Sequence, residues 1–129
     1  MATHNELGAL GEQIAVDYLI ERGYQIIERN WSNGHKEIDI IAKDGDTIVI
    51  VEVKTRRSTY LVEPEIAVDV YKQRNLIWAA NSYVNRNQYD NDVRFDIISI
   101  VIDRNNEKRI EHIEDAFYPS YKSFYPSVR

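Results

Sequence analysis

The clearest pattern in the chain is an alternation of apolar and charged residues near its middle. It predicts two β-strands, Glu37–Ala42 and Thr47–Thr55, joined by a tight turn at Asp44-Gly45, a dipeptide that favours hairpins. Because side chains alternate between the two faces of a strand, the charged residues of this hairpin share one face. The other face is wholly apolar and is predicted to be core: Ile38, Ile40, Val49, Val51 and Val53.

A two-residue turn at this place also predicts which residues lie opposite each other. Counting back from the turn, Asp39 lies opposite Ile50, and Glu37 lies opposite Glu52. Asp39 and Glu52 are then diagonal neighbours, roughly 7–8 Å apart, so both carboxylates can reach one ion. The like-charged pair of Glu37 and Glu52 weakens the sheet unless a divalent cation or Lys54 neutralises it. Two interpretations stay open, a metal site and the solvated face of an amphipathic hairpin.

Helical periodicity before the hairpin predicts a helix from Glu6 to about Arg22, with Asn5 as its N-cap. At ~100° per residue, one side of this helix is polar and the other is apolar. Glu12 falls away from the polar stripe and points inward, where an unpaired carboxylate is costly. Glu12 is therefore an edge residue that reaches solvent or pairs with Arg22 or Arg29, or it is a third carboxylate directed at the hairpin.

The segments on either side of the hairpin are less regular. A first strand is predicted at Tyr24–Asn30, and Thr55–Glu63 is predicted to be a mobile loop. Arg56 and Arg57 lie in this loop with Tyr60 nearby, a combination that suits phosphate contact and base stacking. An ordinary solvated loop explains the same residues.

A second helix is predicted from Asp69, its N-cap, to about Asn85. Lys72 lies in its first turn, and helix starts are good anion sites because their amide groups point outward. Trp78 of this helix is predicted to be core rather than a stacking platform. Two further strands follow: Val93–Asp103 and the weaker Arg109–Ile113.

Length and composition restrict the class of protein. The 129 residues fit one domain, 1–129, with residues 116–129 as an aromatic C-terminal arm. The absence of cysteine excludes disulfides and thiolate metal ligands. No signal-peptide pattern or membrane-length apolar run is present, so we expect a cytoplasmic protein with no membrane partner. The net charge of −5 argues against a large nucleic-acid surface, although basic residues outnumber acids between Lys54 and Arg94.

The charged face of the hairpin points to phosphodiester chemistry. Carboxylate oxygens select Mg²⁺ or Mn²⁺ over zinc. A metal held by Asp39 and Glu52 would activate water and neutralise charge on a phosphodiester. Lys54, on the same face, would orient or deprotonate that water or stabilise the developing charge. The pattern does not separate these roles.

This arrangement resembles known nuclease motifs. Asp39, twelve residues and then Glu52-Val53-Lys54 resemble the PD-(D/E)XK signature of the restriction-endonuclease-like fold. The inward Glu12 resembles the helical acid of archaeal Holliday-junction resolvases within that group. From about Asn5 to Val101 the chain is similar to the YraN-like family of small bacterial proteins. The matching blocks are GEQIAVDYLIERGYQIIERNW, EIDIIA, VEVKTR, Pro64-Glu65, Ala67-Val68, Lys72 and Arg94-Phe95-Asp96.

Two positions depart from these patterns without removing an expected metal ligand. Lys36 stands where this family usually has glycine, and Ile38 stands in place of the proline of the PD signature. The resemblance implies an α/β fold with a restriction-endonuclease-like core, in which helices flank a central mixed sheet in the order αβββαβ.

The resemblance also implies a function and roles for particular residues. The expected activity is a Mg²⁺- or Mn²⁺-dependent endonuclease acting on nucleic acid, with DNA, branched or flapped, as the favoured substrate and a homodimer as a candidate assembly. Asp39 and Glu52 would ligate the metal, with Glu12 as a further ligand that Glu37 could replace. Lys54 would act in catalysis. The residues expected to contact phosphate are Arg56, Arg57 and Lys72. The alternative function is a non-catalytic nucleic-acid-binding or adaptor module that keeps this fold.

Overall fold

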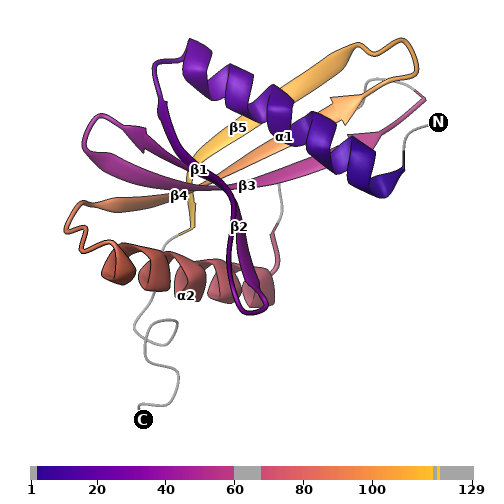
Figure 1. Cartoon of the computed structure of the whole chain (residues 1–129). Coiled ribbons are helices and arrows are strands. Elements are labelled where there is room, and N and C mark those ends of the chain that lie inside the picture. Colours follow the sequence, from indigo (N-terminus) through magenta and orange to yellow (C-terminus); the bar gives the residue numbers. More distant parts are fainter. Residues whose placement is uncertain (1–2, 60–67, 118, 120–129) are drawn as a thin grey trace.

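A five-stranded sheet in the order β1-β2-β3-β4-β5 lies between two helices in the computed structural model, which describes residues 3–59, 68–117 and 119 (Figure 1). Within these residues the elements follow the order α β β β α β β, which confirms the predicted α/β class and mixed sheet. Their bounds are α1 His4–Glu21, β1 Gln25–Asn33, β2 Lys36–Asp44, β3 Thr47–Arg57, α2 Val70–Arg86, β4 Val93–Ile102 and β5 Lys108–Phe117.

The sheet is mixed because of the place of α2 in the chain. Strands β1, β2 and β3 form an antiparallel meander. The chain then passes through α2 and returns as β4, which pairs with β3 in parallel, and β5 pairs with β4 antiparallel. The two helices cover opposite faces of this sheet: α1 packs mainly on β3 and β1, and α2 packs mainly on β2 and β1 (Figure 1).

Each face of the sheet carries its own apolar core. On the α1 side, Leu19 packs with sheet residues such as Val51 and Ile98, and on the α2 side, Leu76 and Tyr83 pack with residues such as Ile50. Four of the five residues predicted as core in the hairpin are fully buried, and Val53 is partly buried. Burial of each such side chain stabilises the fold by about 1.5–3 kcal/mol, and this holds the central strands rigidly in place.

The predicted N-cap of the first helix is wrong, and that of the second is confirmed. Helix α1 begins two residues earlier than expected, because the Thr3 hydroxyl accepts a hydrogen bond from the Glu6 amide at 3.1 Å. Thr3, a short polar residue like Asn5, therefore serves as the N-cap. At α2, the Asp69 carboxylate accepts from the Lys72 amide at 2.8 Å.

The register of the central hairpin differs from the prediction. The turn residues are Gly45 and Asp46, and Asp44 pairs with Thr47. Gly45 has φ of 62°, a left-handed conformation that glycine adopts without steric cost. Moving the turn by one residue shifts the pairing by two, so side chains near the turn keep their predicted face while their opposite neighbours change. Farther from the turn the prediction is wrong for Ile38, which was predicted on the face of Ile40 and Val51 but packs on the α2 side of the sheet.

Other segment boundaries also changed. Strand β3 continues to Arg57, so Arg56 and Arg57 belong to a strand rather than to the predicted loop. The remainder of that loop from Tyr60 onward lies outside the described residues. Of the predicted C-terminal arm, residues 116 and 117 belong to β5, and all but one of the rest lie outside the described part. Among the described residues, neither helix has the length and apolar character needed to cross a membrane.

Candidate active site at the fork between β2 and β3

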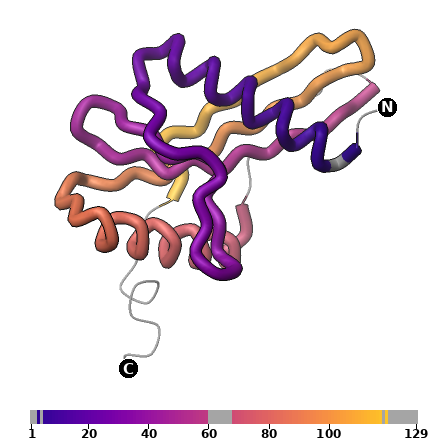
Figure 2. The backbone as a smooth tube through the Cα atoms, viewed as in Figure 1, coloured from indigo at the N-terminus to yellow at the C-terminus, as the bar shows by residue number. Residues whose placement is uncertain are grey.

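The two strands of the central hairpin separate part of the way along their length. Their pairing ends at Ile40 and Val51. Beyond this point β2 stays paired with β1, whereas β3 continues alongside β4. Figure 2 shows the tip of the β1–β2 hairpin bending toward α2 and away from β3. The fork between the two strands opens beside Asp39, whose Oδ2 accepts a hydrogen bond from the Val53 amide at 2.8 Å.

Asp39 and Glu52 meet at this fork. The register that ends at Ile40 and Val51 would place them opposite each other if it continued by one residue, so the predicted pairing of Glu37 with Glu52 is wrong. Glu37 instead pairs with Ser32 of β1. The displaced turn explains the difference, because the register shifted by two brings Asp39 in place of Glu37 to the position opposite Glu52. The strands then separate, and the Val53 amide bonds to a side chain in place of the β2 backbone.

Glu52 is a buried acid, and only 8% of its surface is exposed. Burial is the largest cause that raises the pKa of Glu52 to about 7, and the adjacent carboxylate of Asp39 raises it further. The ammonium group of Lys72 opposes this rise, with its Nζ 3.4 Å from Glu52 Oε2. Near neutral pH Glu52 is therefore close to taking up or releasing a proton, and a carboxyl pKa raised by burial and a like charge is common at functional sites.

The basic side chains predicted to act at the site lie on two elements, α2 and β3. The structure places Lys72, predicted to contact phosphate, against Glu52 from the first turn of α2. Lys54 and Arg56 follow Glu52 on the same face of β3, since alternate residues share a face. These two residues line a hollow of about 280 Å³ together with Ser99 of β4. Arg57 lies on the other face.

The side chain of Arg57 contacts the turn between β4 and β5. Its Nη1 donates to the Asp103 carbonyl at 3.2 Å and lies 3.5 Å from Asn106 Oδ1. A side chain used in this way stabilises the turn. The predicted phosphate contact of Arg57 would require it to leave these partners.

A polar cavity of about 560 Å³ opens between α1 and the fork. Three of the acids named from the sequence line it: Glu12 from α1, and Glu37 and Asp39 from β2. Glu52 is not part of its wall and reaches Asp39 from the α2 side. The predicted acids therefore lie in two places, Glu12 and Glu37 in the cavity and Glu52 outside it, and Asp39 belongs to both.

Glu12 points inward as predicted, and it has partners. Its Oε1 accepts from Arg29 Nε and from Asn30 Nδ2, both at 3.0 Å. Pairing with Arg29 was one of the two alternatives for this residue. Asn30 adopts a positive φ of 52°, a conformation that asparagine tolerates better than most residues. Asn30 was not predicted as a partner, and its only sequence signal is its polarity within the first strand.

The donor set suits a hard divalent cation with few protein ligands. Across the described ranges, no group of three or more Asp, Glu or His side chains is arranged to hold a metal ion. Mg²⁺ usually takes only one or two carboxylates, and water and substrate phosphates complete its shell. Asp39 and Glu52 supply two carboxylates whose mutual repulsion and burial a cation would relieve. The residues present therefore fit Mg²⁺ or Mn²⁺ as a two-carboxylate site.

A second polar cluster, on the α1 face of the sheet, is structural. Asp96 is fully buried, and its carboxylate accepts from Arg94 at 2.9 and 3.0 Å and from the Asp115 amide at 3.0 Å. His112 Nε2 lies 2.7 Å from the same carboxylate. Burial alone would raise the pKa of Asp96, but the bonds from His112 and Arg94 outweigh it and hold the pKa below its usual value. Tyr24 completes the cluster, with its hydroxyl 2.6 Å from Arg94.

Comparison with known proteins gives one consistent family. A family model described as uncharacterised protein family UPF0102 matches residues 11–100. A UPF0102 protein of Bacteroides thetaiotaomicron is 53% identical over 119 residues, which are 92% of this chain and 98% of that protein. A relative of the same name from Porphyromonas gingivalis is 47% identical over 118 residues, 91% and 87% of the two chains. One from Thermodesulfovibrio yellowstonii is 48% identical over 113 residues, 88% and 96% of the two chains.

Proposed function

The chain belongs to the UPF0102 family, as its resemblance to YraN-like proteins predicted, and we propose that it is a metal-dependent nuclease that hydrolyses phosphodiester bonds of nucleic acid. The observation that carries the proposal is the pair formed by Asp39 and Glu52 at the fork. A fold gains nothing in stability from two carboxylates held together with one of them buried, because such a pair resists ionisation. Binding of a cation, and then of a phosphate, explains why the two carboxylates are held together.

In this proposal Asp39 and Glu52 hold Mg²⁺ or Mn²⁺. The bound ion would supply Lewis-acid activation of water and neutralise charge on the phosphate. Lys54, two residues after Glu52 on the same face, orients the attacking water and takes its proton or stabilises charge on the phosphorane oxygens. Lys72 holds Glu52 in place through their contact at 3.4 Å. Glu12 and Glu37 line the polar cavity together with Asp39 and would hold water there.

The nucleic acid would approach along the face of β3 that carries these cations. Lys54 and Arg56 line a hollow next to the pair, and their charges favour a phosphate backbone. Glu52 repels phosphate while it is ionised, so the cation that neutralises it also favours the substrate. DNA, including branched or flapped forms, is the favoured substrate class, and RNA is tested beside it.

A cleavage panel tests the proposal. Labelled single-stranded DNA, duplex DNA, flap, four-way junction and RNA are incubated with Mg²⁺, Mn²⁺ or EDTA. The wild type is compared with Asp39→Asn, Lys54→Ala and a control, Asp46→Asn, which alters an exposed acid in the turn of the same hairpin. We expect metal-dependent cleavage by the wild type and the control and a loss of at least about 100-fold in the other two variants.

The other outcomes of this panel are informative. Binding of one substrate without cleavage by a folded wild type would support the non-catalytic binding or adaptor module instead. Equal cleavage by all four proteins would show a contaminating nuclease and would contradict a role for Asp39 and Lys54.

A further inference from the structure

A second hollow, of about 530 Å³, lies between the tip of the β1–β2 hairpin and the side of α2. We propose that it binds an unstacked nucleobase of a single-stranded segment, next to the site of cleavage. The inference rests on the proposed function in that it takes the substrate to be nucleic acid. Its walls are Asn33 and Lys36 of the hairpin and Trp78, Asn81, Ser82 and Asn85 of α2.

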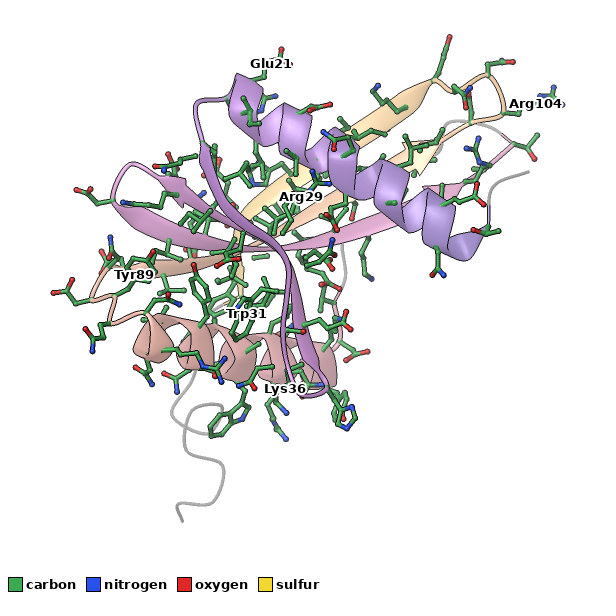
Figure 3. All side chains as sticks on the ribbon, in the orientation of Figure 1. Glu21, Arg29, Trp31, Lys36, Tyr89 and Arg104 are labelled. Carbon is green, nitrogen blue, oxygen red and sulfur yellow. The ribbon has the colours of Figure 1, made fainter. Side chains whose placement is uncertain are left out.

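The walls of this hollow are fixed to each other. Asn33 Nδ2 donates to Ser82 Oγ at 2.8 Å, which joins the hairpin tip to α2. Behind this bond Trp31 packs edge-on against Tyr83, with ring centroids 5.3 Å apart. Figure 3 shows Trp31 and Lys36 on the hairpin close to α2. A site built between two tied elements needs little ordering when a ligand binds, which favours affinity.

The chemistry of the walls suits a nucleobase. The structure leaves Trp78 partly exposed in the wall of the hollow and outside both apolar cores of the described residues, so its predicted position in the core is wrong. An exposed indole stacks on any base, because every base has a π-face. The amides of Asn81 and Asn85 can each donate and accept, as the edges of bases require.

Charge also favours an anionic strand at this place. Although the chain has a net charge of −5, no acid lines this hollow among the residues that the structure describes, and Lys36 is positioned at its wall to meet a phosphate. A neutral or anionic ligand is therefore accepted here without the repulsion that the acids of the fork create. This combination of an indole, amides and one lysine is typical of single-strand recognition.

The hollow is connected to the fork by the first residues of β2. Lys36 lines the hollow, while Glu37 and Asp39 line the acidic cavity. Lys36 and Asp39 are three residues apart, which is about 10 Å along a strand. A base in the hollow would thus lie within a few nucleotides of a phosphate at the carboxylate pair. A base within an uninterrupted duplex is paired and stacked and cannot enter, which selects substrates with an unpaired nucleotide beside the cut.

The two tryptophans of the chain make this inference directly measurable. In the Trp31→Phe variant, Trp78 is the remaining fluorophore, and we expect short single-stranded oligothymidine in EDTA to quench it. In the Trp78→Phe variant, Trp31 reports, and we expect no quenching although binding is retained. Trp78→Ala should weaken binding of the same oligonucleotide by about 5- to 150-fold, as loss of one stacked base predicts. Duplex of the same length should bind equally to wild type and Trp78→Ala.

The outcomes separate this inference from the proposed function. Unchanged fluorescence of Trp31→Phe at saturating oligonucleotide, or equal binding by wild type and folded Trp78→Ala, would overturn the base site. Absence of single-strand binding by the wild type would overturn it as well. If Asp39→Asn abolishes cleavage of flaps and Trp78→Ala leaves it unchanged, the proposed nuclease activity is supported and the base site is contradicted. Quenching without any metal-dependent cleavage would support the base site and contradict the nuclease. Melting curves of each variant establish that it is folded.

Discussion

Replacement of Glu52 by glutamine should make the metal-free protein more stable at alkaline pH. Burial and the neighbouring Asp39 raise the pKa of Glu52 from 4.5 to about 7. Between these two values the folded protein holds a proton that the unfolded chain has released. The free energy of unfolding therefore decreases as the pH rises from about 4.5 and through about 7, and the stabilisation present at low pH is lost above that range.

The size of the effect follows from the same values. Each unit of difference between the folded and unfolded pKa is worth about 1.4 kcal/mol, so the ionised Glu52 costs about 3 kcal/mol at pH 8. Glutamine has a similar shape and no charge, so Glu52→Gln should avoid this cost. We expect urea unfolding in EDTA to show the two proteins within about 1 kcal/mol at pH 5 and the variant more stable by up to about 3 kcal/mol at pH 8.

A control and a metal arm complete this experiment. Glu21→Gln, at the exposed end of α1, should follow the wild type at every pH (Figure 3). Saturating Mg²⁺ or Mn²⁺ at pH 8 should stabilise the wild type, because binding to the folded state raises stability by mass action, and should have little effect on Glu52→Gln. A difference in the free energy of unfolding between Glu52→Gln and wild type that stays constant from pH 5 to 8 would show that the pKa of Glu52 is not raised in the folded protein.

Two further substitutions test the packing that positions the site. An added Cβ at Gly11 of α1 would overlap the side chain of Thr55 on β3, so Gly11→Ala should lower the free energy of unfolding by about 1–3 kcal/mol in urea titrations. Asp96→Asn removes the charge that pairs with Arg94 in the buried cluster and should cost about 3–5 kcal/mol in the same assay.

Each of these substitutions has a matched control in the same element or cluster. Gly8→Ala, in the same helix with open space around it, should raise the free energy of unfolding by about 0.5–1 kcal/mol. Asp44→Asn removes the exposed partner of Arg94 and should cost at most about 1 kcal/mol. Stabilisation by Gly11→Ala, or equal effects of Asp96→Asn and Asp44→Asn, would contradict the packing described.

The sequence was sufficient where local pattern determines structure. Alternation identified the faces of β3, and periodicity identified an inward Glu12, because burial follows from the repeat of each element. In β2 alternation failed at Ile38, which packs on the α2 side although Ile40 packs on the α1 side. The N-cap of α2 was predictable because Asp69 is a strong capping residue directly before the apolar stripe. Asp39, Glu52 and Lys54 were named from their spacing, and the structure brings Asp39 and Glu52 into contact.

What the sequence could not give depends on contacts between distant residues. The fork arises where β2 and β3 pair with different neighbours, and alternation within one strand does not report that choice. The contact of Lys72 with Glu52 requires α2 to be placed over the sheet. His112 reaches Asp96 from the last strand, next to a shift in the β4–β5 register that no local pattern marked.

Asp39 and Glu52 are proposed to form one metal site. Calorimetric titration of Mn²⁺ into the wild type, Asp39→Asn and the control Asp46→Asn at pH 8 tests this proposal most directly, with repeats in buffers of different ionisation enthalpy near pH 7. We predict a single site in wild type and control, proton release on binding near pH 7, and affinity at least about tenfold weaker in Asp39→Asn. Equal affinity in all three proteins, with no proton released near pH 7, would contradict the proposal.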